Sequence, residues 1–496
     1  MALGGCRSAS VPAIPQTLAV RAAGAGTDIG SGACERRRND TVNKLEQCIR
    51  LDSLWKHLAQ FQQIADENPG KLGHPNRNTG TEGYAASVAY VAKLMRDAGY
   101  RVTIQTYTYH TLELDGTPIF RRLGQRYAYE RDWFVARLSG AGTLTAGVEP
   151  PGRARDGCEA RDFSGFHRGA IALLAESGCD LDTQVANAQA AGAGAVILYD
   201  TQRDAHEARL IDQARIAVIS VSAQIGGRLL RESLAGETPA VRIEVPERSH
   251  SGPDYNVIAD SPYGNPRSTV VVEGHLDSIY GAGMLDNASG STTILDIALA
   301  LAKTPTRNHL RFIWFGGEEI GLEGSRYYTK NLPLRQLRRI AFDVDADVTA
   351  TPNYDITIAD PANANKVDKF PPNVVPESKV GNDYFAHYFK KGGIIFRDFR
   401  HGNNGTDSLS FALAGVPDTG ILTQQDCCKK RWETELWGGF LGNYEGRVPG
   451  HNGGCVDHPH RWCDNLSNND PFVFELASKA VAYVTFELAN RPNFKH

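Results

Sequence analysis

Runs of apolar residues separated by polar turns predict alternating strands and helices in the middle of the chain. Val270–Val272 form a β-branched run that ends at Gly274, and Arg311–Phe315 form a second apolar run that ends at Gly316. Between the two runs, Ser291–Ala302 carry apolar residues at helical spacing. The pattern therefore predicts strand, loop, helix, strand and helix in that order, which is typical of an α/β fold.

The flanking segments extend this pattern. An apolar stripe that begins at Leu45 predicts one helix, and Tyr84–Ala98 predict a second, which Gly99 closes as a C-cap. Val102–Tyr109 alternate as in a strand. Further on, the sequence predicts an acidic strand and two helices, over Arg339–Asn353, Asn382–Lys391 and Phe472–Leu488. The predicted fold class is α/β, with a mixed central β-sheet flanked by helices.

A shift in composition near Trp133 marks a second unit with its own pattern. Strands are predicted over 170–174, 194–199 and 216–221, with a helix over 183–191. This unit has no cluster of His, Asp or Glu at ligand spacing, which favours an accessory module over a second active site. The first pattern returns at Tyr255. We therefore predict an N-terminal tail (1–40), a discontinuous main domain (41–133 and 249–496) and an inserted domain (134–248).

Composition and charge narrow the classes of function. The chain has 496 residues and a net charge of −4, which argues against nucleic acid or an anionic membrane surface as a partner. No apolar run approaches the roughly 20 residues needed to cross a bilayer, so no transmembrane segment is predicted. Nine cysteines occur without a C-x-x-C pair. This spacing favours disulfides in an oxidising compartment, with buried free thiols in a cytosolic enzyme as the alternative.

Two disulfides are expected from position along the chain. Cys158 and Cys179 bracket the first part of the inserted unit, and Cys34 and Cys48 can join the tail to the first helix.

The export route stays open. The segment that ends at Cys6 resembles the tail of a bacterial lipoprotein signal but lacks the long apolar stretch before it. Either the chain begins inside a signal peptide, with a lipid anchor at Cys6, or the match is chance. A secreted, extracellular or periplasmic protein is expected.

Acidic residues and a histidine stand where the predicted strands end. His275 and Asp277 follow the first strand, Asp286 lies in the next loop, and Glu318 and Glu319 follow the second strand. In open α/β sheets, sites lie at the carboxyl ends of strands. Imidazole and carboxylate suit zinc with an open catalytic position. Two adjacent buried carboxylates are costly unless a cation is present, so one of them is expected to bind metal and the other to act as a general base.

Each candidate also has a structural alternative. A lone histidine at a strand end is more often structural, and Asp286 alone is explained as a helix N-cap. The further candidates are three aspartates of the acidic strand and two histidines near the C-terminus: Asp343, Asp345, Asp347, His458 and His460. Because a chance assembly of all these groups is improbable, a metal site is the favoured hypothesis.

These motifs resemble those of the zinc-dependent aminopeptidases of peptidase family M28. The family pattern has a histidine in AHLDS, an aspartate in DNASG, a Glu-Glu in GEExGLxGS, an aspartate in FDMxGSPN and a histidine in YHxxCD. This chain has GHLDS, LDNASGS, GGEEIGLEGS, ADVTATPN and PHRWCDN. The resemblance covers most of 45–110 and 250–490. The inserted unit resembles a protease-associated (PA) domain, and the resemblance is carried by the segments GCEARDFSGFHRGAIALL and VANAQAAGAGAVILYD. A zinc-dependent exopeptidase fold with an inserted β-rich PA domain is implied.

The resemblance implies a centre with two Zn²⁺ ions. His275 and Asp347 would hold one zinc, Glu319 and His460 would hold the other, and Asp286 would bridge them. Asp347 is chosen over the other aspartates of its strand because the residues after it align with GSPN. His460 is chosen over His458 as the last histidine because it stands three positions before the pair Cys463-Asp464.

The resemblance also implies the catalytic groups. Glu318 would be the general base that takes a proton from the zinc-bound water and so forms the attacking hydroxide. Asp277 would orient the zinc-binding histidine. The Asp286–Asn287 peptide would be cis. Asp407 resembles the aspartate of the family's Ser-Asp turn, and we expect it to support the pocket without binding metal.

The chain departs from the family pattern near its C-terminus. Pro459 stands where relatives have a tyrosine that helps to hold the oxyanion, so that donor is missing or comes from elsewhere. Cysteines are also placed unusually there, and we expect Cys455 to pair with Cys463.

The leading hypothesis is a secreted zinc metallo-exopeptidase that hydrolyses the N-terminal peptide bond of peptides. A carboxypeptidase, a dipeptidase or a glutaminyl cyclase-like enzyme on the same fold is the alternative. A catalytically silent receptor-like homologue is disfavoured because this chain keeps all the ligand positions.

Overall fold

The computed structural model divides into two compact units. It describes residues 31–70, 73–114, 116–122, 124–129, 131–152, 155–200, 205–208, 210, 213–279, 281–361, 370–400, 405–424, 429–441, 444, 464–492 and 494. Among the described residues, unit 1 holds those before Thr108 and those from Pro253 onward, and unit 2 holds Thr108–Gly252. Unit 1 is therefore discontinuous in the sequence. The domain borders predicted at 133/134 and 248/249 differ from these divisions and stay predictions.

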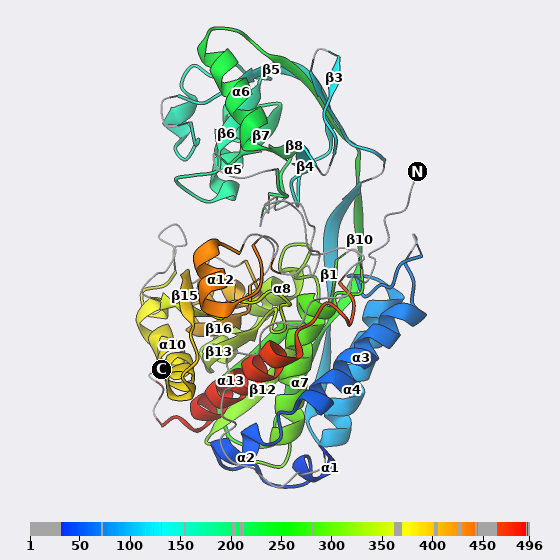
Figure 1. Ribbon diagram of the computed structural model, residues 1–496, viewed down its shortest axis with the longest axis vertical. Coiled ribbons are helices and arrows are strands. Elements are labelled where there is room, and N and C mark those ends of the chain that lie inside the picture. Colours follow the sequence, from blue (N-terminus) through cyan, green and yellow to red (C-terminus); the bar gives the residue numbers. More distant parts are fainter. Residues whose placement is uncertain are drawn as a thin grey trace. The chain divides into compact units, whose positions relative to one another are not determined.

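Unit 1 is built on an eight-stranded mixed sheet (Figure 1). The three central strands β12, β11 and β13 are parallel to one another, and β16 continues them in parallel. β10 and β14 pair antiparallel on either side of this group. In spatial order the strands are β1 (Arg101–Leu114), β10 (Glu247–Asp260), β12 (Asn308–Phe315), β11 (Asn265–His275), β13 (Ile340–Ala346), β16 (Asp418–Leu422), β14 (Thr357–Asp360) and β15 (Arg397–Arg400).

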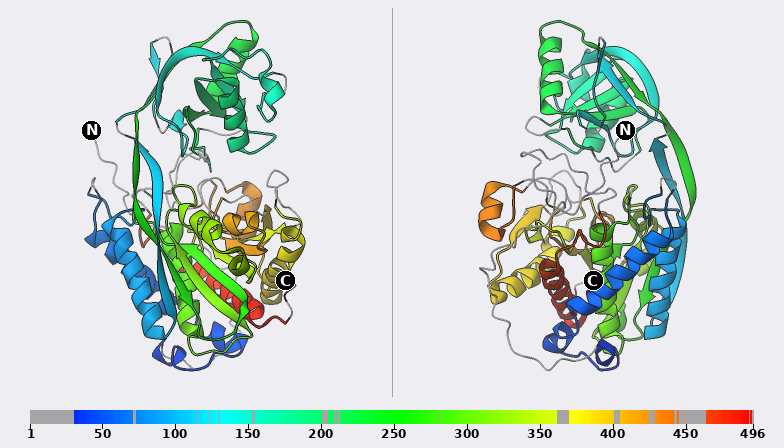
Figure 2. Two further views of the ribbon diagram at one scale, coloured as in Figure 1. Left: turned by 180° about the vertical axis from the view of Figure 1, so that it is seen from behind. Right: turned by 45° about the vertical axis from the view of Figure 1, so that its right-hand side comes forward.

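Helices cover both faces of this sheet. Figure 1 shows α3, α4, α7 and α13 in front of the strands, and the view from behind in Figure 2 brings the strands forward. The helices of unit 1 are α1 (Ser31–Cys34), α2 (Val42–Glu46), α3 (Leu51–Glu67), α4 (Glu82–Ala98), α7 (Gly290–Leu301), α8 (Glu323–Asn331), α9 (Leu334–Leu337), α10 (Val374–Gly392), α11 (Ser408–Leu413), α12 (Arg431–Trp437) and α13 (Pro471–Asn490).

Alternation along the central strands feeds two cores. In β11, Val270 and Val272 belong to the large core shared with α3, α4, α7 and α13, whereas Val271 belongs to a smaller core on the other face. That second core also receives Tyr328 from α8 and Phe411 from α11. Because both faces are covered, the central strands read as continuous apolar runs. The predicted mixed sheet flanked by helices is confirmed.

The N-terminal helices differ in detail from the sequence prediction. The apolar stripe that begins at Leu45 is divided between α2 and α3, because the chain turns at Cys48. Cys48 forms the expected disulfide with Cys34. The side chain of Asn39 lies buried beside this disulfide and donates to the carbonyl oxygen of Ala300, the next-to-last residue of α7. The tail segment is thereby fixed to the end of the helix that follows the candidate site.

Unit 2 has its own eight-stranded sheet and two longer helices. Its strands, in spatial order, are β3 (Gln125–Arg126), β2 (Ile119–Arg122), β9 (Ala240–Val245), β5 (Gly142–Glu149), β6 (Ile171–Ala175), β7 (Ala195–Tyr199), β8 (Ala217–Val221) and β4 (Trp133–Val135), and its helices are α5 (Leu181–Ala191) and α6 (Ala223–Leu234). The expected disulfide between Cys158 and Cys179 is present. Helix α6 has no counterpart among the predicted elements. Within the described parts of the chain, no helix is long and apolar enough to cross a membrane.

One buried polar group in unit 1 generates a stability prediction. Asp296 lies on the otherwise apolar α7 and accepts a hydrogen bond from Ser53 at 3.0 Å, and its carboxylate is 3.5 Å from the His57 ring. Burial raises the pKa of Asp296 to about 8 and lowers the pKa of His57 to about 4. At neutral pH both groups are therefore uncharged.

We predict that Asp296 destabilises the fold as the pH rises. The folded state keeps the proton of Asp296 between about pH 4 and 8, whereas the unfolded chain has already lost it, so stability falls through this window by up to about 1.4 kcal/mol per pH unit. The lowered pKa of His57 makes stability rise with pH, but only below about pH 6.5. Urea unfolding from pH 6.5 to 8 should show a steeper loss of unfolding free energy for wild type than for Asp296→Asn, with Asp66→Asn, at an exposed position on α3, as the control. Parallel curves for wild type and Asp296→Asn would contradict the prediction.

Candidate metal centre

The candidate residues meet at one edge of the central sheet. β11 pairs in parallel with β12 on one side and β13 on the other, with His275 opposite Phe315 at the end of the first pair. Because parallel strands end at the same edge, the residues that follow each strand are brought together. The pair Glu318–Glu319, which follows β12, and Asp347, which follows β13, therefore lie beside His275.

His275 lies at the centre of this group and is 1% exposed. Its Nε2 is 2.9 Å from Asp286 Oδ1, 3.4 Å from Asp347 Oδ1 and 3.9 Å from Glu318 Oε2. Its Nδ1 lies 3.1 Å from the backbone oxygen of Asp277, which is closer than the 3.6 Å to the carboxylate of the same residue. The ring is therefore oriented through a backbone carbonyl, with Nε2 facing the carboxylates.

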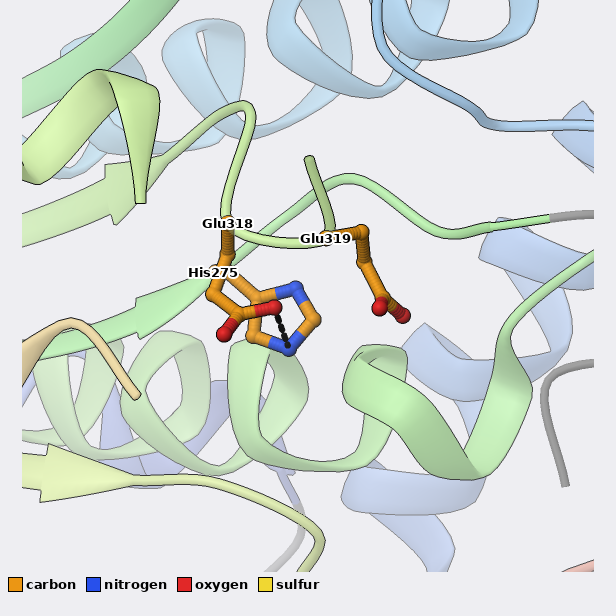
Figure 3. A group of neighbouring side chains, drawn as sticks. All are labelled: His275, Glu318 and Glu319. Carbon is orange, nitrogen blue, oxygen red and sulfur yellow. Dashed lines mark ion pairs between the residues drawn. The ribbon is translucent and has the colours of Figure 1, made fainter. Parts of the chain in front are cut away.

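Glu318 and Glu319 reach the histidine from a tight turn. Figure 3 shows Glu318 over the imidazole ring of His275 and Glu319 beside it. The turn requires Gly317, whose φ is +68° and where a Cβ would lie 2.8 Å from the Tyr107 hydroxyl. The turn is held by Asp277, because its two carboxylate oxygens accept the backbone N–H groups of Glu318 and Glu319 at 3.2 and 3.3 Å.

Asp286 is presented by an irregular turn, Met284–Ser289, that leads into α7. The peptide between Asp286 and Asn287 is cis, as the resemblance implies. The side chain of Asn287 donates to the carbonyl oxygen of Ala346 at the end of β13 and accepts from Gly290 N–H. A Cβ at Gly290 would collide with the same carbonyl oxygen. Close contact between the start of α7 and the end of β13 therefore sets the position of Asp286.

Three residues to which the sequence motifs assign no role hold these groups in place through hydrogen bonds. Asp464 accepts the backbone N–H groups of Leu285 and Asp286 at 2.7 and 3.1 Å. Thr79 donates to Asp277 Oδ2 at 2.9 Å, and the buried Arg77 donates to backbone carbonyls of the same region. The motif PHRWCDN contains Asp464 and so carried a signal. Arg77 and Thr79 lie in a polar stretch that has no periodic pattern.

The electrostatics of the site favour a bound cation. Although burial by itself disfavours the charged ring, the surrounding carboxylates, Glu318 foremost, raise the pKa of His275 well above its usual value. Burial and repulsion from neighbouring carboxylates raise the pKa values of Glu273, Asp345 and Asp407 well above the ordinary range. A concentration of buried acidic groups of this kind is stabilised by a divalent cation, which removes the need for protons.

The donor geometry also fits a metal. The donor atoms of His275, Asp286 and Asp347 lie within 4.8 Å of one another, and so do those of His275, Glu318 and Glu319. All five residues are buried. Imidazole and carboxylate donors in such a set match the ligands that zinc takes in catalytic sites.

The structure therefore brings together every predicted site residue that it describes. Asp407 is buried close to the same group, on the N-terminal side of α11. His460 lies outside the described residues, as do Cys6, Pro459 and the predicted Cys455–Cys463 pair. The individual roles of the site residues stay predictions.

Comparison with known proteins agrees with this architecture. Residues 256–485 match the model of peptidase family M28, and residues 141–229 match the PA domain model. An aminopeptidase of Pseudomonas aeruginosa (strain UCBPP-PA14) is 29% identical over 461 residues, which cover 89% of this chain and 81% of the relative.

Two solved structures have a similar fold. The aminopeptidase from Aneurinibacillus sp. strain AM-1 has a TM-score of 0.69 at 19% identity, covering 92% of this chain and 98% of that one. BSAP, a zinc aminopeptidase from Bacillus subtilis, has a TM-score of 0.56 at 19% identity, covering 90% of this chain and 96% of that one. At these identities the likeness concerns the fold.

We predict that zinc stabilises the folded chain through His275 and its neighbours. A ligand that binds only the folded state adds about 2.7 kcal/mol at 100 times its dissociation constant. Thermal unfolding should therefore shift to higher temperature with zinc and return on chelation. His275→Ala should lose most of the shift, whereas the control His309→Gln, at a histidine outside the cluster, should retain it. Equal shifts in both variants would place zinc binding elsewhere.

Proposed function

Because the chain belongs to peptidase family M28, with a PA domain between the two parts of its peptidase unit, we propose that it is a zinc-dependent aminopeptidase. It would hydrolyse the N-terminal peptide bond of peptides. The observation that carries this proposal is the buried cluster around His275, in which carboxylates from three chain segments face one imidazole nitrogen. The names of the relatives support the same activity.

The proposed centre holds two zinc ions. His275 and Asp347 would hold one, Asp286 would bridge, and Glu319 would hold the other together with His460. The grouping of His275, Asp286 and Asp347 donors within 4.8 Å supports the first of these assignments. Asp286 is a suitable bridge because its position is fixed on both sides, by Asp464 at its N–H and by the start of α7.

Each group then has a distinct task in the reaction. Zinc, when bound, would act as a Lewis acid that lowers the pKa of water and polarises the scissile carbonyl. Glu318 takes the proton of the attacking water and later delivers it to the leaving amine. Asp277 holds the backbone of the Glu318–Glu319 turn and, through its carbonyl oxygen, the ring of His275. The proton carrier and two of the proposed metal ligands, His275 and Glu319, are thus held by the same residue.

Secretion stays a prediction. The two disulfides of the described residues are typical of an oxidising compartment. Peptides are the expected substrates, and the preferred side chain is a question for substrate profiling.

We predict that the enzyme cleaves aminoacyl-arylamides with a free amine but not their N-blocked forms, and that Glu318→Gln removes this activity. Loss of the general base should lower kcat at least about 100-fold, while zinc content by elemental analysis stays at the wild-type value. Glu435→Gln, at an exposed position on α12, is the matched control and should keep full activity.

Other outcomes separate the alternatives. Cleavage at the C-terminus of peptides, or cyclisation of N-terminal glutamine, would move the reaction to the carboxypeptidase or glutaminyl cyclase-like alternative. Near-normal activity of Glu318→Gln would remove this residue from the mechanism. Zinc-loaded protein without any of these activities would contradict the proposed function.

A further inference from the structure

A fully buried arginine lies behind the metal centre. Arg77 precedes α4, is 0% exposed and makes three hydrogen bonds to backbone carbonyl oxygens. Its Nη1 donates to Leu276 at 2.7 Å, and its Nε and Nη2 donate to Ala282 and Gly283, both at 2.8 Å. Burial lowers the pKa of Arg77 only to about 10, so it is positively charged at neutral pH.

The three carbonyls belong to the two ends of one loop. Leu276 stands between His275 and Asp277 at the end of β11, whereas Ala282 and Gly283 come immediately before the turn that presents Asp286. One guanidinium group therefore joins the segment that carries the histidine to the segment that carries the aspartate. The planar fork of arginine has donors in fixed directions, which a lysine ammonium cannot reproduce.

A guanidinium group binds the carbonyl oxygens of this loop, and a buried carboxyl group binds the amides that follow. Beyond the carbonyls bound by Arg77, the backbone N–H groups of Leu285 and Asp286 donate to the side-chain oxygens of Asp464. Buried backbone groups without partners are costly, so Arg77 satisfies the carbonyl oxygens and the side chain of Asp464 satisfies the amides. Phe61 contributes a ring 5.2 Å from the guanidinium carbon, which confines Arg77 further.

We propose that Arg77 is a positioning residue that sets the separation of His275 and Asp286 and so determines the zinc affinity of the centre. The proposal rests on the proposed function for the identity of the metal. The three hydrogen bonds of Arg77 go to backbone carbonyl oxygens, so it acts on the two side chains through the backbone of the loop. Residues that orient metal ligands typically change metal affinity 10- to 100-fold when replaced.

The test compares Arg77→Lys and Arg77→Met with Arg96→Met, at an exposed arginine on α4. Zinc affinity is measured by competition with a chromophoric chelator. It should fall about 10-fold or more in both Arg77 variants and stay unchanged in the control. Hydrogen exchange followed by mass spectrometry should rise in peptides that contain 276–287 and stay at the wild-type level in α10 and unit 2.

These readouts separate positioning from a general role in folding. A lower melting temperature with wild-type zinc affinity, or faster exchange throughout unit 1, would overturn the proposal. Failure of both Arg77 variants to fold would overturn it too, since Arg77 would then hold the fold as a whole. Absence of peptidase activity in the wild type would refute the proposed function and leave the zinc measurement to decide the role of Arg77.

Discussion

Repulsion among buried carboxylates is the constraint around which unit 1 is built. Asp286, Glu318, Glu319 and Asp347 are buried around a single imidazole at the edge of the sheet, and further acidic side chains lie close behind them. Burying like charges at this density is unfavourable without a compensating cation. A divalent metal converts the same arrangement into a set of ligands, so the fold and the proposed chemistry depend on the same interaction.

The parallel strands explain why these groups meet, and side chains from distant segments explain why they are held firmly. Asp277 ties the end of β11 to the Glu318–Glu319 turn through two backbone hydrogen bonds. Arg77, about 200 positions earlier in the chain, and Asp464, about 180 positions later, hold the loop that carries Asp286. An active site formed at strand ends needs such support, because a displacement of the reacting groups by about 1 Å can cost a large part of the rate.

Much of this site could be predicted from the sequence because its parts follow strongly apolar strands. The run that ends at His275 and the run that ends before Glu318 identify both strand ends, and their burial follows from the surrounding apolar residues. The roles of Arg77 and Thr79 could not be predicted in this way. They act through backbone and carboxylate hydrogen bonds that exist only in the folded chain, and their segment has no periodic pattern. The break between α2 and α3 could not be predicted for the opposite reason, because a continuous helical stripe runs through the turn at Cys48.

Anomalous diffraction at the zinc absorption edge, on crystals of the full chain grown with zinc, would locate the metal ions directly. We expect a strong peak in contact with His275, Asp286 and Asp347, and a second peak in contact with Asp286 and Glu319. A single peak at the first position would support the metal centre and contradict the proposed pair of ions. Zinc-containing crystals with no peak near His275 would show that the buried carboxylates at this sheet edge do not form a zinc centre.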